Sequence, residues 1–298
     1  MTLPNFLIVG AAKSGTTSLY HYLNQHPEVF LPANKEPHHF APAKWCGHPP
    51  LDRASYEKLF EGTANYTVRG EASTGYLYYP DSPDMIHKGI PDCRIVIILR
   101  EPVARAYSGY CHELREGLET VSFEEALAEE RRGTRIIRGG EFSFNYIKQS
   151  IVCHLIKRYI ALFGQDRVHI CLYDDLVENP AELMHQLFRF LGVDDTFDGN
   201  WGYRYNPSGL PRMQALHNLL DGENIISYRL RQFVASRGPD SRWQSLWHRL
   251  RDWNISSRHD MFIEGETERF LRQRFEPEIR CLETLLERDL SHWRNPVA

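Results

Sequence analysis

A segment near the N-terminus, Gly10-Ala-Ala-Lys-Ser-Gly-Thr-Thr-Ser18, has the residue types of a loop that binds an anion. Glycine lets the backbone approach a ligand closely, and the N–H groups at the start of a helix favour negative charge. The spacing follows that of the phosphate-binding P-loop up to Gly15, but Thr16 stands where that loop has its lysine. An ordinary ATP or GTP hydrolase is therefore disfavoured, and the segment suits a phosphate or sulfate group held in another way.

The lysine of this segment, Lys13, lies inside the loop instead. It could be a solvated side chain on a tight strand-to-helix turn, but the successive hydroxyls that follow it favour an anion site. The candidate ligands are Lys13, Ser14, Gly15, Thr16, Thr17 and Ser18.

A second candidate anion site follows the apolar run at residues 94–99. Arg100 stands at the carboxyl end of that run, where open α/β sheets bind ligands, and Ser108 lies two turns into the helix that follows. An arginine with a hydroxyl suits a phosphate monoester. Arg105 is ambiguous because it could pair with Glu101, four residues before it, and the whole cluster could be a solvated helix start.

Short apolar runs alternate with helical patterns along most of the chain. We expect strands at 5–10, 94–99 and 167–173, a further strand within 66–73, and helices at 19–25, 103–116, 122–132, 150–163 and 180–191. Buried strands alternating with helices indicate a parallel α/β sheet flanked by helices. The last third, from Arg212 onward, is expected to be mostly helical. No linker divides the sequence, so residues 1–298 are interpreted as one domain.

The composition excludes several classes of protein. With 298 residues, of which 42% are hydrophobic, the chain can bury a sizeable core, and no apolar run is long enough to span a membrane. The formal net charge of −4 gives no support for nucleic-acid binding, and the N-terminus lacks the pattern of a signal peptide. The 6 cysteines are widely spaced, which disfavours a zinc site or a disulfide scaffold and predicts a protein of the reducing cytoplasm.

Two anion sites at successive strand ends, without the P-loop lysine, resemble those of the sulfotransferases that use 3′-phosphoadenosine 5′-phosphosulfate (PAPS). The resemblance is closest to the heparan-sulfate-type branch and its bacterial relatives, and it implies a P-loop-like α/β fold. Further segments resemble this family in the same order along the chain, namely residues 35–40, 70–76, 174–180, 190–192, 206–212 and 286–293.

The resemblance implies a role for each candidate residue. In the family the first loop holds the 5′-phosphosulfate, here through Lys13 and residues 14–18, and the second site holds the 3′-phosphate, here through Arg100 and Ser108. Arg212 lies in a segment that resembles the loop closing near the nucleotide.

Glu36 matches the glutamate that is the proposed general base of the family. It could instead pair with Lys35 or a nearby arginine, and His38 or His39 could be the base, because histidine is the commonest general base. The sequence departs from the family at His39, which replaces an aromatic residue, and at Ala72, where animal heparan-type enzymes often have a lysine. The match therefore does not establish the acceptor side of the site.

The implied reaction transfers a sulfuryl group from PAPS to an acceptor hydroxyl or amine, and adenosine 3′,5′-bisphosphate (PAP) leaves. Lys13 and Glu36 are the candidate catalytic residues, and no metal is expected. The acceptor is expected to be a small molecule or a carbohydrate, since the near-neutral charge disfavours a long polyanion. The alternatives are a P-loop nucleotide-dependent kinase and a non-catalytic nucleotide-binding protein on the same fold.

The sequence leaves two interpretations open for each of three further features. Glu71 could orient a site cation or form a structural ion pair. The tryptophan-containing stretch at 243–253 has helical spacing, so it could be core or line an acceptor pocket. A basic run could attract an anionic acceptor or be a solvated helix end; it comprises Arg131, Arg132, Arg135 and Arg138.

Overall fold

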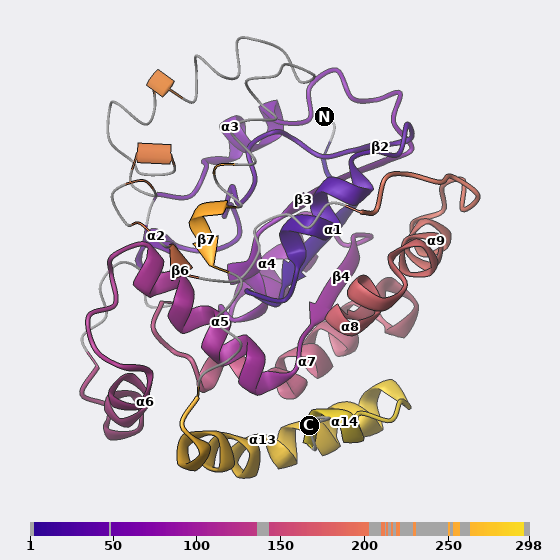
Figure 1. The fold of residues 1–298 in the computed structure, drawn as a ribbon. Helices are drawn as coiled ribbons and strands as arrows, with labels where there is room; N and C mark the ends of the chain where they lie inside the picture. The colour runs from indigo at the N-terminus through magenta and orange to yellow at the C-terminus, as the bar shows by residue number, and fades with distance from the viewer. Residues whose placement is uncertain are drawn as a thin grey trace.

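The computed structural model describes residues 3–47, 49–135, 143–202 and 263–294, together with isolated positions between 210 and 256. A parallel sheet forms the centre, with the strand order β2-β3-β1-β4-β5 (Figure 1). The strands are β1 (Phe6–Gly10), β2 (Val29–Phe30), β3 (Val68–Ala72), β4 (Arg94–Leu99) and β5 (Val168–Leu172). A separate antiparallel pair consists of β6 (Leu210–Pro211) and β7 (Ile255–Ser256).

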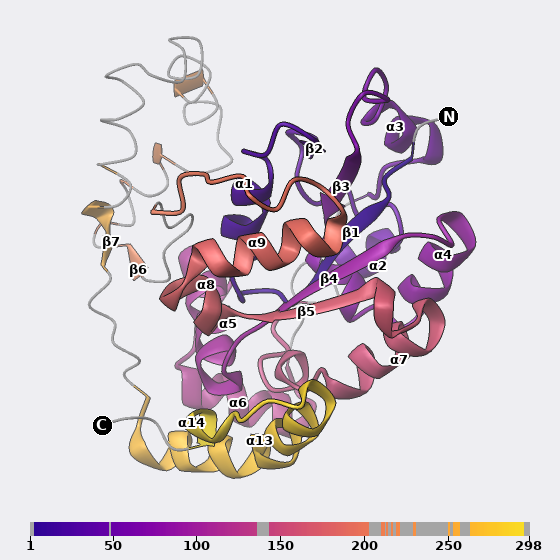
Figure 2. The same cartoon turned by 90° about the vertical axis from the view of Figure 1, so that its right-hand side faces the viewer.

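Helices connect the strands and cover both faces of the sheet, as Figure 2 shows from the side. The α-helices are α1 (Thr16–Leu23), α2 (Ala43–Cys46), α3 (Arg53–Lys58), α4 (Ser82–Gly89), α5 (Pro102–Arg115), α6 (Phe123–Arg132), α7 (Cys153–Phe163), α8 (Tyr173–Glu178), α9 (Pro180–Leu191), α13 (Gly265–Leu286) and α14 (Ser291–Arg294). Short 3₁₀ turns are η1 (Thr74–Leu77), η2 (Lys148–Ser150) and η3 (Gln165–Arg167).

The core has two layers because successive strand side chains point to opposite faces of a sheet. One layer packs strand residues against α4, α5, α7 and α13, and the strand residues are Leu7, Val9, Ile95, Ile97 and Leu99. The other packs strand residues against α1 and α9, and those residues are Phe6, Ile8, Val96, Ile98 and Cys171. Because strands buried on both faces are apolar at every position, they could be found in the sequence as continuous runs.

The expected fold class is confirmed, and β4 and α9 have the predicted bounds. The bounds of other elements differ from the predicted ones by a few residues. Helix α1, for example, was predicted at 19–25 and begins at Thr16 and ends at Leu23. The two-residue strand β2 and the short helices α4 and α8 were not predicted. They are shorter than the window of residues over which a hydrophobic period can be recognised. In the last third, α13 and α14 are helical as expected, and most of residues 212–262 lie outside the described residues.

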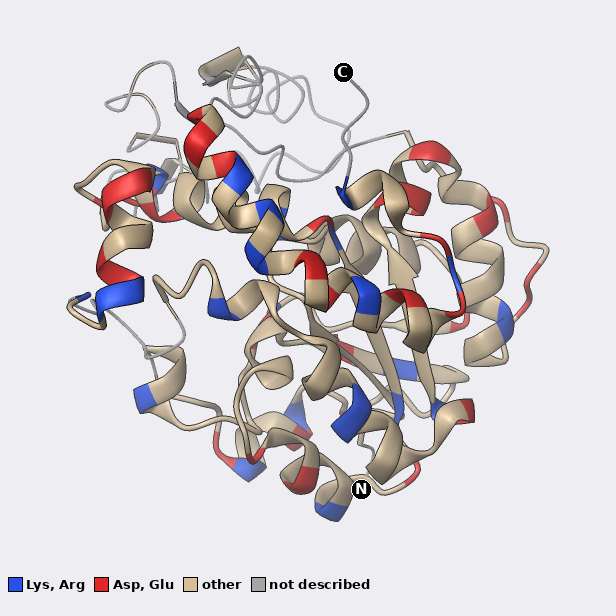
Figure 3. Cartoon of the chain, turned by 90° about the horizontal axis from the view of Figure 1, so that it is seen from below, with Lys and Arg blue, Asp and Glu red and all other residues tan. Residues whose placement is uncertain are grey.

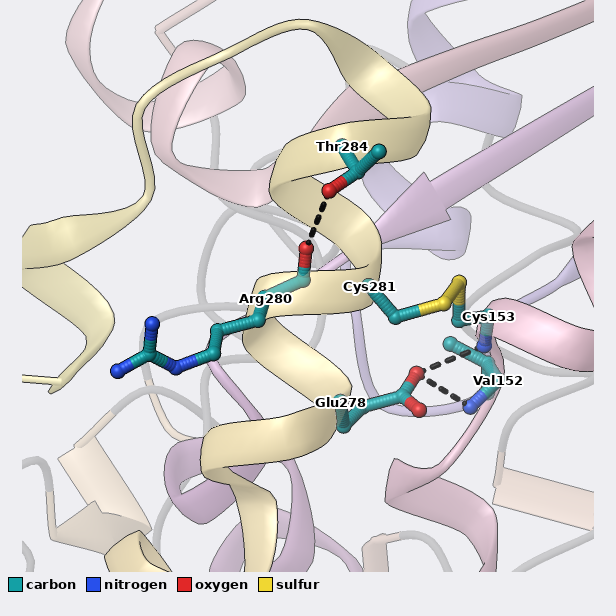
Figure 4. The surroundings of a disulfide bond; sticks show 6 residues. All are labelled: Val152, Cys153, Glu278, Arg280, Cys281 and Thr284. Carbon is teal, nitrogen blue, oxygen red and sulfur yellow. Dashed lines mark hydrogen bonds between the residues drawn. A yellow bond between two sulfur atoms is a disulfide. The ribbon is translucent and has the colours of Figure 1, made fainter.

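A disulfide bond joins the first residue of α7, Cys153, to Cys281 in α13, with 6.2 Å between the Cα atoms (Figure 4). Beside it, the buried carboxylate of Glu278 accepts hydrogen bonds from the N–H groups of Val152 and Cys153, both at 2.7 Å. These N–H groups at the start of α7 lack intrahelical partners, so Glu278 caps the helix. The long C-terminal helix is thus fixed to the sheet layer by a covalent bond and a cap.

The cysteine spacing disfavoured a disulfide scaffold, and it did not indicate this single disulfide bond. Cysteine spacing carries no information on which residues meet in space, and Cys153 and Cys281 are 128 residues apart. The remaining cysteines, Cys46, Cys93, Cys111 and Cys171, are free thiols. Because disulfides are rare in cytosolic proteins, the cysteines no longer support the expectation that the protein is cytoplasmic. Among the described helices, none is both long and apolar enough to cross a membrane.

Reduction of the disulfide should lower the free energy of unfolding by about 2–4 kcal/mol, because the bond closes a long loop in the unfolded chain. Urea denaturation of the oxidised protein, with and without dithiothreitol, measures this loss. The double variant Cys153→Ser/Cys281→Ser should be less stable than the oxidised protein and insensitive to the reductant. An unchanged denaturation midpoint in the reduced wild type would show that the bond does not stabilise the fold.

Candidate functional site

Three loops that carry candidate residues meet at one edge of the sheet. In a parallel sheet all carboxyl ends lie at the same edge, and β1 pairs with β3 on one side and β4 on the other. The loop with Lys13 follows β1, and Arg100 follows β4. Glu36 joins the same edge through its own N–H, which donates to the carbonyl of Ala72 at the end of β3 (3.0 Å).

The loop after β1 has the geometry of an anion cradle. Gly15 has φ +96°, and a Cβ there would lie 2.8 Å from Leu176 Cδ2, so glycine is required on both conformational and steric grounds. Gly15 has no side chain to cap α1, and the first turn of α1 has no acidic residue. The N-terminal N–H groups of α1, including those of Thr16, Thr17 and Ser18, are therefore oriented as donors to an external anion.

Lys13 is half-buried in this cradle. Burial lowers the pKa of its amine to about 7, and the positive charge of Arg115 on α5 acts in the same direction, while the carboxylate of Glu36 opposes it. Glu36 and Lys13 are thus close enough to influence each other. An ammonium group whose charge is disfavoured in the free protein is ready to be stabilised by an anionic ligand.

Arg100 contacts the loop directly, since its Nη1 donates to the carbonyl of Lys13 at 3.2 Å. Its guanidinium also stacks over the ring of Tyr173, at 4.7 Å from the centroid. Glu101 caps the following helix by accepting hydrogen bonds from the N–H groups of Val103 and Ala104. Ser108 lies on the same helix and is 8% exposed.

The expected pair between Arg105 and Glu101 does not form. Arg105 is only 2% exposed and binds a neighbouring segment instead. Its Nε donates to Ser150 Oγ (2.7 Å), its Nη1 to Gln149 Oε1 (2.9 Å) and its Nη2 to the carbonyl of Tyr146 (2.6 Å). The carboxylate of Glu101 is engaged as a helix cap, so it cannot also reach the helix interior.

Glu36 is surrounded by hydrogen-bond donors. Its Oε1 lies 2.9 Å from Lys35 Nζ, its Oε2 lies 3.1 Å from His38 Nε2, and both oxygens are 3.3 Å from Thr74 Oγ1. The Glu36 side chain remains 32% exposed. The predicted alternative of a Lys35 pair is therefore present, and it coexists with an accessible carboxylate.

The charges in this cluster stabilise one another. Burial would raise the pKa of Glu36, but Lys35 and His38 hold it well below its usual range. Burial would likewise lower the pKa of His38, but hydrogen bonds to Cys46 and Glu36 raise it to about 9. In the free protein at neutral pH, Glu36 is therefore a carboxylate and His38 an imidazolium, which leaves His38 without a lone pair to act as a base.

The backbone around Glu36 is held in an unusual conformation. Glu36 and His38 both have positive φ, at 63° and 51°, which costs free energy for residues other than glycine. The N–H of His38 donates to Ser73 Oγ (3.2 Å), whose hydroxyl donates to Glu71 Oε2 (2.9 Å). Glu71 is fully buried, and burial raises the pKa of its carboxyl to about 7, although hydrogen bonds from Ser73 and Tyr76 oppose this. Glu71 thus supports the site backbone from below.

Other predicted candidates lie away from this site or beyond the described residues. Arg212 and Arg138 are outside the described residues, as is most of the 243–253 stretch, whose Trp253 is 51% exposed. His39 is half-buried, with its ring stacked on Tyr56 and Nδ1 2.8 Å from the carbonyl of Leu51. It is therefore a packing residue.

The three described arginines of the basic run all have partners. Arg132 pairs with Glu125 at 2.7 Å, Arg135 pairs with Glu119 and Glu129, and Arg131 lies over the ring of Phe270 at 4.4 Å. Figure 3 shows the same mixing of blue and red along the helices on this side of the molecule.

Sequence reasoning missed two neighbours of the site, Thr74 beside Glu36 and Arg115 near Lys13. Thr74 lies in a segment that was singled out, but nothing in its spacing connected it to residue 36. Arg115 was read as part of a helix only. Its spacing from Ser108, seven residues along the helix, places both on one helix face and could have indicated it.

Comparison with known proteins identifies the family. Residues 3–205 match the sulfotransferase domain family. The chain belongs to this family. The match confirms the expectation of an enzyme of the PAPS-dependent sulfotransferase family, and it disfavours the kinase alternative.

Relatives of this sulfotransferase include the mouse heparan sulfate glucosamine 3-O-sulfotransferase 3B1, which is 25% identical over 209 residues. A bifunctional heparan sulfate N-deacetylase/N-sulfotransferase of Drosophila melanogaster is 25% identical over 238 residues. The alignments cover 70% and 69% of this chain, but only 51% and 21% of the two relatives. The chain thus spans about half or less of the curated relatives it matches.

Solved structures agree with the family. A sulfotransferase from Alicyclobacillus acidocaldarius is 28% identical, with a TM-score of 0.70 over 99% of this chain and 100% of its own. Mouse sulfotransferase SULT7A1, solved in complex with PAP, shares the fold at 15% identity, with a TM-score of 0.51 over 95% of this sulfotransferase and 88% of its own chain.

PAP binding to this sulfotransferase should be accompanied by proton uptake at Lys13. Its pKa is about 7 in the free protein, and an anionic ligand raises that pKa because it favours the ammonium form. Affinity should therefore fall as the pH rises above about 7. Calorimetry near pH 8 in buffers of different ionisation enthalpy should show protons taken up on binding, and Lys13→Met should abolish this uptake. Equal uptake in that variant would assign the proton to another group.

Proposed function

We propose that this chain transfers a sulfuryl group from PAPS to a hydroxyl or amine of an acceptor, with Glu36 as general base and without a metal. The observation that carries the proposal is the direct contact of Arg100 with the Lys13 loop at the sheet edge where Glu36 also lies. Two cationic residues and one accessible carboxylate at the same edge of the sheet support the proposal, because transfer of an anionic group requires both kinds of charge close together.

The residues present fit PAPS as the donor. The loop after β1, with Lys13, the hydroxyls of residues 16–18 and the N-terminal N–H groups of α1, would hold the 5′-phosphosulfate. Arg100 and Ser108 would hold the 3′-phosphate. Burial is the main cause of the lowered pKa of Lys13, and the positive charges of Arg115 and Lys35 act in the same direction. A ligand with an anionic group beside Lys13 would favour its ammonium form.

Lys13 and Glu36 would act at the two ends of the reaction. In sulfuryl transfer, negative charge develops on the leaving phosphate oxygen, and the ammonium of Lys13 with the loop N–H groups stabilises it. The carboxylate of Glu36 takes the proton of the acceptor hydroxyl or amine as the new bond to sulfur forms. Thr74 and the imidazolium of His38 keep this carboxylate oriented.

The pair between Lys35 and Glu36 makes Glu36 a weak base in the free protein. A phosphosulfate group bound beside Lys35 competes for its ammonium, because the group carries more negative charge than one carboxylate. Departure of Lys35 from Glu36 would raise the pKa of that carboxyl, so donor binding would strengthen the base before transfer.

We infer an acceptor that is a carbohydrate or a small molecule. The relatives named for heparan sulfate act on a carbohydrate. The net charge of −4 and the carboxylate partners of Arg132 and Arg135 give no support for a long polyanionic acceptor, which would require a basic groove.

Binding of PAP should depend on its 3′-phosphate and on Arg100. In titration calorimetry of metal-free protein, we expect PAP to bind with micromolar affinity and adenosine 5′-monophosphate to bind at least about tenfold more weakly. Arg100→Ala should remove most of this preference. The matched control is Arg167→Ala, because Arg167 precedes β5 at the opposite edge of the sheet and pairs with exposed Asp92. If ATP with magnesium binds as tightly as PAP, the result would favour the kinase interpretation over the sulfotransferase interpretation.

Glu36→Gln should lower turnover by about 10²-fold or more while PAP affinity is retained. The assay uses ³⁵S-labelled PAPS with the best acceptor from a screen of carbohydrates and small hydroxyl compounds. The control is Glu57→Gln, which removes a carboxylate that pairs with Arg53 on α3. Near-wild-type turnover of Glu36→Gln would eliminate Glu36 as the base.

A further inference from the structure

Two arginines line one small cavity beneath the candidate donor site. Arg100 and Arg105 both border it, together with Ser14 from the loop after β1 and with Gln149 and Ser150. The hydroxyl of Ser14 is fully buried and has no hydrogen-bond partner among the described residues. The cavity therefore connects the two halves of the donor site, the loop after β1 and the residue that follows β4.

The charge of Arg105 is held only by neutral groups. Its guanidinium donates to the hydroxyl of Ser150, the side-chain amide of Gln149 and the backbone carbonyl of Tyr146, and it also hydrogen-bonds the phenol of Tyr78. Glu130 lies close enough for its charge to act on Arg105, but its carboxylate accepts hydrogen bonds from the N–H groups of residues 147 and 148. A buried cation without a direct counter-ion is costly, and Arg100 beside it adds repulsion.

The segment that holds Arg105 is itself firmly attached. Ser150 Oγ donates to the carbonyl of Pro102, two residues after Arg100. Val152, which also borders the cavity, is fixed to α13 by Glu278, and the disulfide of Cys153 follows directly (Figure 4). Arg105 therefore joins the start of α5 to a covalently braced part of the core.

Arg105 also shares a helix face with Ser108. The two residues are three positions apart on α5, and residues at that spacing lie on the same side of a helix. The guanidinium is thus positioned behind Arg100 and alongside Ser108. Its shielding from solvent keeps its field from being screened by water.

We propose that Arg105 is a positioning residue for the 3′-phosphate of the donor. It does not contact the phosphate. It holds the start of α5, and it supplies a buried positive charge without a hydrogen-bonded counter-ion, so the Arg100–Ser108 site prefers a dianion. This inference rests on the proposed function, because it takes the 3′-phosphate of PAPS as the ligand of that site.

The test compares PAP with adenosine 5′-monophosphate by titration calorimetry in four proteins: wild type, Arg105→Met, Gln149→Glu and Gln273→Glu. Gln149 accepts a hydrogen bond from Arg105 at 2.9 Å, and Gln149→Glu puts a carboxylate at that position as a direct counter-ion. This variant tests the inference even if Arg105→Met does not fold. Gln273→Glu makes the same charge change on an exposed position of α13 and is the matched control.

We expect Gln149→Glu and Arg105→Met to weaken PAP binding by about tenfold and to change the binding of the monophosphate by less than about twofold, with Gln273→Glu unchanged. If Arg105 has only a structural role, the variants should weaken the binding of both nucleotides equally, and that result would overturn the inference. A wild-type preference for PAP in Gln149→Glu would overturn it as well. If the wild type itself does not prefer PAP to the monophosphate, the proposed function fails instead.

Discussion

Burial of cationic side chains at one edge of the sheet is the constraint on which the rest of the site depends. The strand order β3-β1-β4 puts Lys13 and Arg100 on neighbouring strand ends, and Arg105 lies behind them. No fold tolerates such a cluster without cost, because burial removes the water that would otherwise screen the charges. Carboxylates near Lys13 and Arg100 oppose this effect only in part, because burial still lowers the pKa of both cations. The anionic donor proposed above would stabilise both charges.

The carboxylate of Glu36, in contrast to the buried cations, has direct partners of opposite charge. Glu36 has compensating charges on both sides, Lys35 and His38, and it occupies a positive-φ conformation that the surrounding hydrogen bonds must maintain. Below it, Ser73 and the buried Glu71 fix the backbone without adding another exposed charge. A carboxylate held this way is accurately placed but weakly basic. Its reactivity is therefore coupled to whatever draws Lys35 away.

The sequence could predict the layers of the fold because fully buried strands are apolar at every position and glycine loops have few alternatives. It identified Lys13, Arg100 and Glu36 for the same reason: each lies directly beside a recognisable strand or motif. It could not predict the disulfide between Cys153 and Cys281 or the partners of Arg105, because these contacts join residues that are far apart along the chain. The alternative in which Arg105 pairs with Glu101 is not the one found, because the Glu101 carboxylate caps the helix instead.

The two charge arrangements together explain why this P-loop-like site differs from that of a phosphoryl-transfer enzyme. In a P-loop hydrolase, a lysine at the first helical position and a hydrated magnesium ion share the neutralisation of the phosphates. Here Thr16 occupies that position, and Lys13 approaches from within the loop, where Arg100 binds its carbonyl. In the proposed reaction, neutralisation would fall to Lys13 and Arg100, which follow the neighbouring strands β1 and β4, and Glu36 at the same sheet edge would accept the proton.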